Sequence, residues 1–150
     1  MPGSFALKTP QDLLRKLHHD PHRLMREPAD ACTAFDFFVT ALHLPDWLYP
    51  GDAPKRQQLF AHHLLLQVCR HLAEGSTHFE VVPKCRPAVT DTSRAAGALP
   101  PGAFQTTGFS GGYLIVTLDG AAAAQFGTTM TVTTLATHIL TFWETHPDLR

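Results

Sequence analysis

One line of polar side chains runs along an otherwise apolar stretch of the chain, from Asp30 to Trp47. Read as an α-helix, this stretch carries hydrophobic residues on nearly every side, which is typical of a buried element. Its polar residues recur at helical spacing and share one face: Thr33, Asp36, Thr40 and His43. Because burying an unpaired carboxylate costs several kcal/mol, we expect Asp36 to be ionised and to accept at least two hydrogen bonds. At least one donor should come from another helix, and the candidates by position are Arg70, His71 and His138.

This polar face, extended by Asp46 just beyond it, could do chemistry. Asp36 and His43 are too far apart along one helix for direct contact, and Thr40 lies between them. A carboxylate or imidazole held there could act as a general base or as a metal ligand, with partners from the next helix. The other interpretation is a buried polar network that fixes how three helices pack.

A second group of polar residues follows near the end of the next predicted helix: Arg70, His71, Glu74 and His78. Arg70 and Glu74 are spaced to pair across one helical turn. If this helix packs against the first, His71 or His78 could approach His43, and three imidazoles would suit zinc. The sequence has no HExxH motif, so a surface ion pair beside two ordinary histidines is the favoured interpretation. We therefore predict no cofactor, with zinc on these histidines as the alternative.

A third pattern joins Arg56 to His62 or His63. Small helical ribonucleases can use a histidine as the acid or base and an arginine to stabilise the phosphorane. In a chain with 10 histidines, however, an arginine and a histidine occur at this separation by chance very often. We therefore assign no catalytic residue and keep this trio as the alternative.

Composition limits the classes of partner. The chain of 150 residues has 12 basic and 13 acidic residues, so no strong field attracts it to nucleic acid, and we expect no tight binding to a duplex. No apolar run approaches the roughly 18 residues of a membrane span. The beginning of the sequence has no signal-peptide core, and the cysteines Cys32, Cys69 and Cys85 lack CxxC spacing. A cytoplasmic protein is expected.

Helices are predicted where apolar residues recur at helical spacing between capping and breaking residues. Thr9 followed by Pro10 is typical of a helix start, and Pro21 should end that helix or begin a second. Pro45 should end the central helix that begins after Asp30. The later helices are predicted at residues 54–74, with Gly75 directly after the end, and at residues 131–146.

Strands are predicted in the second half of the chain. Tyr113–Leu118 is rich in β-formers and should end in a turn at Asp119–Gly120. Its partner is expected to be either residues 78–82 or part of residues 121–131. The proline-containing segment 83–112 is expected to wind over the surface.

Together these elements predict a single α+β domain over residues 1–150, a bundle of about four helices with a small antiparallel β-ribbon. The most apolar helical faces should form one core, which we expect to contain Phe35, Phe38, Leu42, Leu65, Val68, Leu72, Ile139 and Trp143.

Two segments carry a resemblance to a known group: AFDFFVTALHLPDWLYPGD (residues 34–52) and LLLQVCRHLAEGSTHFE (residues 64–80). They resemble small uncharacterised bacterial proteins with an H-x-x-DW segment followed by L-x-N-G-x-K-H-F, which are similar in layout to the HEPN helical superfamily. Its members are often ribonucleases, toxins or nucleotide-binding helpers. Glu74 stands where the pattern has asparagine, and Thr77 where it has lysine. The resemblance implies that the recurrent positions are His43, Asp46, Trp47 and His78.

Three functions are compatible with these observations. We expect a non-catalytic bacterial protein that acts through a protein partner or self-association, as a component of a larger system. The first alternative is a HEPN-like ribonuclease or toxin, which needs an arginine and a histidine converging in an open groove. The second is a zinc protein built on His43, His71 and His78, which needs three ligands around one point.

Overall fold

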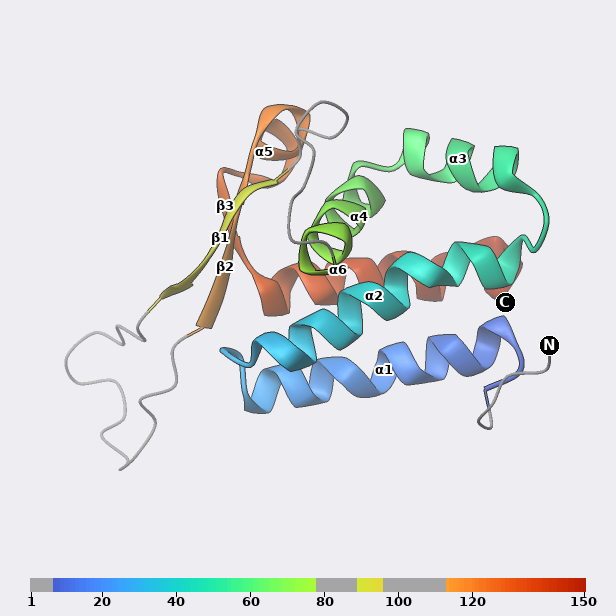
Figure 1. Cartoon of the computed structure of the whole chain (residues 1–150), viewed down its shortest axis with the longest axis horizontal. Helices are drawn as coiled ribbons and strands as arrows, with labels where there is room; N and C mark the ends of the chain where they lie inside the picture. The colour runs from blue at the N-terminus through green and yellow to red at the C-terminus, as the bar shows by residue number, and fades with distance from the viewer. Residues whose placement is uncertain (1–6, 78–88, 96–112) are drawn as a thin grey trace.

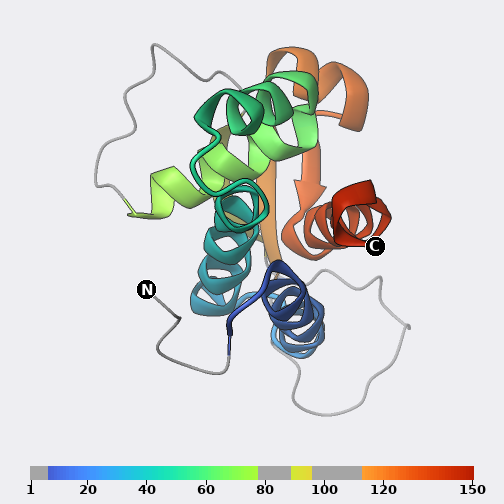
Figure 2. The same ribbon diagram turned by 90° about the vertical axis from the view of Figure 1, so that its right-hand side faces the viewer.

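The computed structural model describes residues 7–77, 89–95 and 113–150. Its elements confirm the predicted class, an α+β fold with a helical bundle and a small antiparallel sheet. In chain order they are α1 (Pro10–Arg26), α2 (Ala31–Leu48), α3 (Ala53–His62), α4 (Leu64–Thr77), β1 (Val89–Ala95), β2 (Tyr113–Leu118), α5 (Gly120–Phe126), β3 (Thr129–Thr131), α6 (Val132–Thr145) and the 3-10 turn η1 (Pro147–Leu149). Helices α1, α2 and α6 run along a common direction, α4 crosses them, and the sheet stands with α5 at one end (Figure 1). The view along the helices places α2 between α1 and α4 (Figure 2). No helix in the described ranges is both long and apolar enough to cross a bilayer.

Helix α1 begins as predicted but does not end at Pro21. The Thr9 hydroxyl accepts from the backbone N–H of Asp12 at 3.1 Å, and the Asp12 carboxylate accepts from the N–H of Thr9 at 2.9 Å, which closes a capping box. Pro21 lies inside the helix, which continues to Arg26. Leu17 and Leu24 are fully buried on either side of this proline. Their packing compensates for the backbone hydrogen bond that proline cannot donate.

Helix α2 likewise continues past Pro45, so the predicted end there is wrong. Pro45 is among the fully buried side chains, and its carbonyl accepts from the backbone N–H of Tyr49 at 2.9 Å. Burial of this turn therefore outweighs the cost of proline in a helix interior. The extra turn carries Asp46 and the partly buried Trp47 on a helix rather than on a loop.

The helix predicted at residues 54–74 is two helices, broken at His63, whose backbone is extended. The side-chain amide of Gln67 donates to the carbonyls of Phe60 at 3.0 Å and Ala61 at 3.3 Å, which provides partners for the end of α3. The His63 ring packs on Phe142 of α6, with ring centroids 4.8 Å apart. These tertiary contacts stabilise a break that no glycine or proline marks. Helix α4 also runs through Gly75 to Thr77, contrary to prediction.

The sheet has the order β1-β2-β3, and both pairs are antiparallel. Strand β2 lies as predicted, and β3 confirms that part of residues 121–131 pairs with it. The candidate strand at residues 78–82 lies outside the described residues. Strand β1 lies within the segment 83–112, where no strand was predicted. The turn predicted at Asp119–Gly120 is instead the start of α5, where the Asp119 carboxylate accepts from the N–H of Gly120 at 2.6 Å.

The core was partly predicted. Phe38, Val68, Leu72, Ile139 and Trp143 are buried in one cluster, as expected. Leu42 and Leu65 are only partly buried, and the prediction for Phe35 is wrong, because its side chain is 38% exposed. Helices α1 and α4 both pack against α2. The buried residues of α2 include Phe37, Phe38, Ala41 and Leu44.

Two phenylalanines of α2 provide a matched test of this packing. Phe38 is 4% exposed, whereas Phe35 is 38% exposed on the same helix. Phe38→Ala should reduce the free energy of unfolding by about 3–5 kcal/mol, because it leaves a cavity in the core. Phe35→Ala should cost less than about 1 kcal/mol. Urea unfolding of both variants measures the difference, and equal losses would show that α2 is not packed as described.

Candidate functional site

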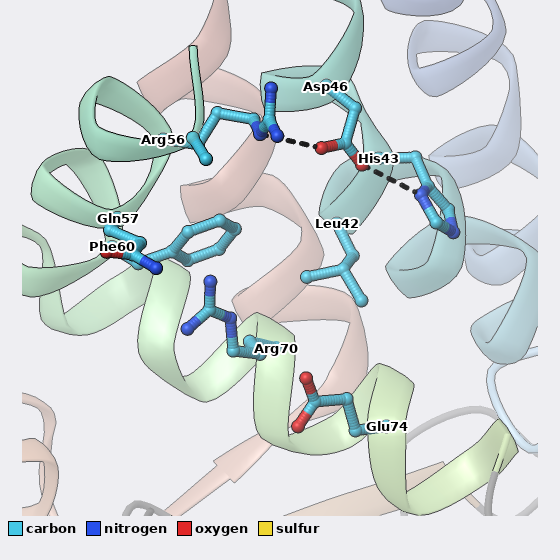
Figure 3. A pocket seen from close by; sticks show the side chains of 9 residues that line it. Leu42, His43, Asp46, Arg56, Gln57, Phe60, Arg70 and Glu74 are labelled. Carbon is cyan, nitrogen blue, oxygen red and sulfur yellow. Dashed lines mark hydrogen bonds and ion pairs between the residues drawn. The ribbon is translucent and has the colours of Figure 1, made fainter. Parts of the chain in front are cut away.

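An open pocket of about 270 Å³ lies between α2, α3 and α4. It brings together basic, acidic and aromatic side chains from these helices (Figure 3). Its lining residues are Leu42, His43, Asp46, Ala53, Arg56, Gln57, Phe60, Arg70 and Glu74.

Asp46 connects two of the helices that form the pocket. One carboxylate oxygen lies 3.2 Å from Nδ1 of His43, one turn earlier on α2. The other lies 3.0 Å from Nε of Arg56 on α3. The side chain of Asp46 is 54% exposed, so water screens both contacts and each adds little to stability. Their importance is geometric, because they fix the direction of an imidazole and a guanidinium at the pocket.

Arg56 is oriented by the turn that joins α2 to α3. Asp52 caps α3 by accepting from the backbone N–H of Lys55 at 3.0 Å, which turns the new helix back toward the end of α2. Nη1 of Arg56 then donates to the carbonyl of Tyr49, the C-cap residue of α2, at 2.6 Å. The remaining nitrogen of Arg56, Nη2, has no hydrogen-bond partner among the described residues. Arg56 therefore retains donors for a ligand.

The opposite wall is formed by a stacked arginine. The Arg70 guanidinium lies over the ring of the buried Phe60, 3.6 Å from its centroid. Stacking on Phe60 fixes the plane of this guanidinium at the wall of the pocket. Glu74 lies one turn further along α4, and its carboxylate is on the same side of the helix as Arg70 (Figure 3). With two arginines and two carboxylates, the lining is neutral when His43 is neutral. Such a pocket recognises a charged group by short contacts rather than by long-range attraction.

The structure therefore brings together five of the residues that the sequence singled out, from different predicted groups: His43, Asp46, Arg56, Arg70 and Glu74. Sequence analysis would have grouped Asp46 with the pocket residues if α2 had been expected to continue through Pro45. With this turn in place, Asp46 shares a helical face with His43.

Asp36 is not the buried carboxylate that the sequence predicted. Its side chain is 48% exposed and lies 3.4 Å from Nη1 of Arg23 on α1, so the expected partner from another helix is present but is a different residue. The Thr40 hydroxyl donates to the Asp36 carbonyl at 2.6 Å and accepts from Nζ of Lys16 at 2.8 Å. His138, one of the proposed donors, is exposed on α6 with its ring 6.5 Å from that of Phe126.

The buried carboxylate is Asp20 on α1, which sequence analysis missed. Its side chain is 3% exposed, and it accepts from Nζ of Lys16 at 2.8 Å. Nη1 of Arg23 lies 3.8 Å away. Asp20 continues the helical spacing of Leu13 and Leu17, which was the available signal. Sequence analysis did not use this signal, because Asp20 directly precedes Pro21, where the helix was expected to end or a second one to begin.

The two histidines proposed to act with Arg56 lie elsewhere. His62 is exposed at the end of α3, and His63 packs on Phe142. Neither residue lines the pocket.

The zinc alternative concerned His43, His71 and His78. His43 lines the pocket, His71 is half-buried on α4 and does not line it, and His78 lies outside the described residues. Within the part of the chain that is described, no group of three potential ligands could hold a metal ion.

Another polar cluster lies where η1 meets the turn from α2 to α3. The Tyr49 hydroxyl donates to Oδ2 of Asp148 at 2.5 Å, and Nζ of Lys55 lies 3.4 Å from the same oxygen. Burial of the phenol, and then the neighbouring Asp148 carboxylate, raise the pKa of Tyr49. The hydrogen bond from Tyr49, followed by that from Lys55, lowers the pKa of Asp148. Nothing in the sequence connects residues 99 positions apart, so this cluster was not predictable.

The two aspartates distinguish a buried ion pair from an exposed one. Asp20→Asn should lower the free energy of unfolding by about 1.5–3 kcal/mol, because a buried hydrogen bond to a charged group is weakened. Asp36→Asn is the matched control and should cost less than about 1 kcal/mol, because its pair is exposed. Denaturant unfolding at neutral pH measures both. A larger loss for Asp36→Asn would restore the original prediction that Asp36 is the structural carboxylate.

Comparisons with known proteins leave the site to be interpreted from its own chemistry. No family model matches the sequence, and neither a curated protein nor a solved structure matches the chain. The resemblance of residues 34–52 and 64–80 to HEPN-like proteins stays a prediction.

Proposed function

We propose that this protein is a non-catalytic binding module that acts through contacts with another protein. Its recognition site is the pocket between α2, α3 and α4, which receives an acidic side chain of the partner. The observation that carries this proposal is the convergence of Arg56, Arg70 and His43 on one open pocket, each held by a neighbour from the fold.

The size of the pocket supports a side chain as its occupant. Pockets that enclose drug-sized ligands and cofactors usually measure about 300–1,000 Å³ and bury most of the ligand. At about 270 Å³, this open pocket is smaller than that range. It has room for one or two side chains that project from a larger molecule.

The chemistry of the lining indicates which kind of side chain. The nitrogen of Arg56 that has no partner among the described residues can donate to a carboxylate while the other two keep their contacts. Arg70 adds a second positive charge at the opposite wall. Leu42 and Phe60 offer apolar surface to the stem of the same side chain. Glutamate combines a carboxylate with such a stem.

The surface next to the pocket supports a protein partner. Phe35, Val39 and Leu42 follow one another along the face of α2 that leads to the pocket. Phe35 is 38% exposed, and the other two are partly buried. Aromatic residues and arginines are both enriched at protein interfaces, and this face of α2 carries an exposed aromatic in line with a pocket that holds two arginines.

The cellular setting belongs to the proposal as well. Cys32 and Cys69 are free thiols, and Cys69 is buried. Unpaired thiols support a reducing compartment, and with the resemblance described above they favour the bacterial cytoplasm.

Titration with short peptides tests this proposal. The probe is a peptide with one glutamate beside a leucine, and the matched control peptide has glutamine in place of glutamate. We expect the glutamate peptide to shift the NMR signals of Arg56, Phe60 and Arg70 and to bind more tightly than the control. Arg56→Gln and Arg70→Gln should each weaken binding by about tenfold, which corresponds to one charged hydrogen bond of about 1.4 kcal/mol.

The control variant is Arg15→Gln, because Arg15 pairs with Asp12 on α1 and does not line the pocket. It should bind the glutamate peptide as the unmodified protein does. Equal binding of the glutamate and glutamine peptides would contradict the proposal.

A ribonuclease is the second candidate. One contact favours it, with His43 in place of His62 or His63 as the histidine. His43 is oriented by Asp46, whose other oxygen holds Arg56, so an acid–base histidine and a phosphate-binding arginine share one pocket. If the purified protein cleaves single-stranded RNA, His43→Gln and Arg56→Ala should abolish cleavage and His62→Gln should not. Cleavage that survives His43→Gln would exclude this arrangement.

A further inference from the structure

His146 connects the end of α6 to η1 through an uncharged ring nitrogen. It is the C-cap residue of α6 and the N-cap residue of η1. The backbone N–H of Asp148 donates to Nδ1 of His146 at 3.3 Å. An imidazolium carries protons on both nitrogens and cannot accept this hydrogen bond. The cap therefore exists only while the ring is neutral.

The surroundings of His146 also oppose a positive charge. The ring packs among the rings of Tyr49, Phe142 and Trp143, with centroids 6.5, 5.8 and 5.5 Å away. The charged and titratable groups that face it are Asp148 on η1, Lys55 on α3, His63 at the break before α4, and the Tyr49 phenol at the end of α2. Burial lowers the pKa of His146, with smaller contributions in the same direction from His63 and Lys55 and an opposing one from Asp148.

The turn capped by His146 holds the end of α2 in place. The Asp148 carboxylate accepts from the Tyr49 hydroxyl at 2.5 Å and from Nζ of Lys55 at 3.4 Å. Leu149 is buried with 7% of its surface exposed. These contacts attach η1 to the turn between α2 and α3, which lies beside the end of α6 (Figure 1).

The same tyrosine reaches the pocket through its backbone. The Tyr49 carbonyl accepts from Nη1 of Arg56 at 2.6 Å, while Nε of Arg56 contacts Asp46 at 3.0 Å. The contacts therefore run without interruption from His146 through Asp148 and Tyr49 to Arg56.

We propose that η1 is a pH-sensitive clamp: protonation of His146 breaks its cap, releases Asp148 from Tyr49, and loosens the position of Arg56 in the pocket. The role of that pocket as a recognition site rests on the proposed function, whereas the clamp itself does not. The neutral ring is favoured in the folded protein, so the clamp is intact above the ordinary histidine value of about 6.5. It weakens as pH falls from there through the lower pKa of His146 in the folded state.

NMR on the full chain between about pH 5 and about pH 8 tests this inference. The signals to follow are the backbone N–H of Asp148 and the Nε–H of Arg56. His146→Asn keeps a side-chain oxygen that can cap η1 but does not titrate, and His146→Ala removes the cap at every pH. His138→Asn is the matched control, because His138 is an exposed histidine on the same helix.

In the unmodified protein and in His138→Asn, we expect both signals to move together with one midpoint below about 6.5. His43 is also linked to Arg56 through Asp46, so the informative quantity is the movement that disappears in His146→Asn. In His146→Ala the Asp148 signal should already have its released position at neutral pH. The proposal would be overturned if the Asp148 signal did not change while His146 titrates. It would also be overturned if the Arg56 signal changed with pH in His146→Asn as it does in the unmodified protein. Because no peptide is present, failure of the peptide titration would not produce either result.

Discussion

The structure depends on the burial of α2 on two sides at once. The Thr40 hydroxyl accepts from Lys16 on α1, while the Cys69 thiol on α4 donates to the Phe38 carbonyl at 3.6 Å. A helix covered by neighbours on both sides has only a narrow strip left for solvent. Polar side chains on α2 that serve a ligand must lie on that strip, and Asp46 does.

The same burial explains why α2 passes through a proline that should have ended it. Pro45 is enclosed by the core, and the hydrophobic gain from this turn exceeds the cost of the missing donor. The consequence extends to the pocket. The added turn brings Asp46 within 3.0 Å of Arg56 and positions the Tyr49 carbonyl to hold the same guanidinium. A helix that ended at Pro45 would leave the pocket without this wall.

Local signals were enough to predict much of the fold and fragments of the site. The Thr9 cap, the β-forming residues of β2 and the apolar face of α6 each specify their element without help from distant residues. The break at His63 depends on Phe142 of α6, and no local pattern encodes it. For the site, sequence analysis chose five residues that line the pocket but assigned them to separate groups, because their convergence depends on how α3 and α4 pack against α2.

A double-mutant cycle on Asp46 and Arg56 tests the central claim most directly, that the fold holds this pair as one recognition unit. The affinity for the glutamate peptide would be measured in Asp46→Asn, in Arg56→Gln and in the double variant. We predict that the effects are not additive, with a coupling energy of at least about 0.5 kcal/mol, because Asp46 acts by positioning Arg56. Additive effects would show that the two residues act independently and would contradict the account.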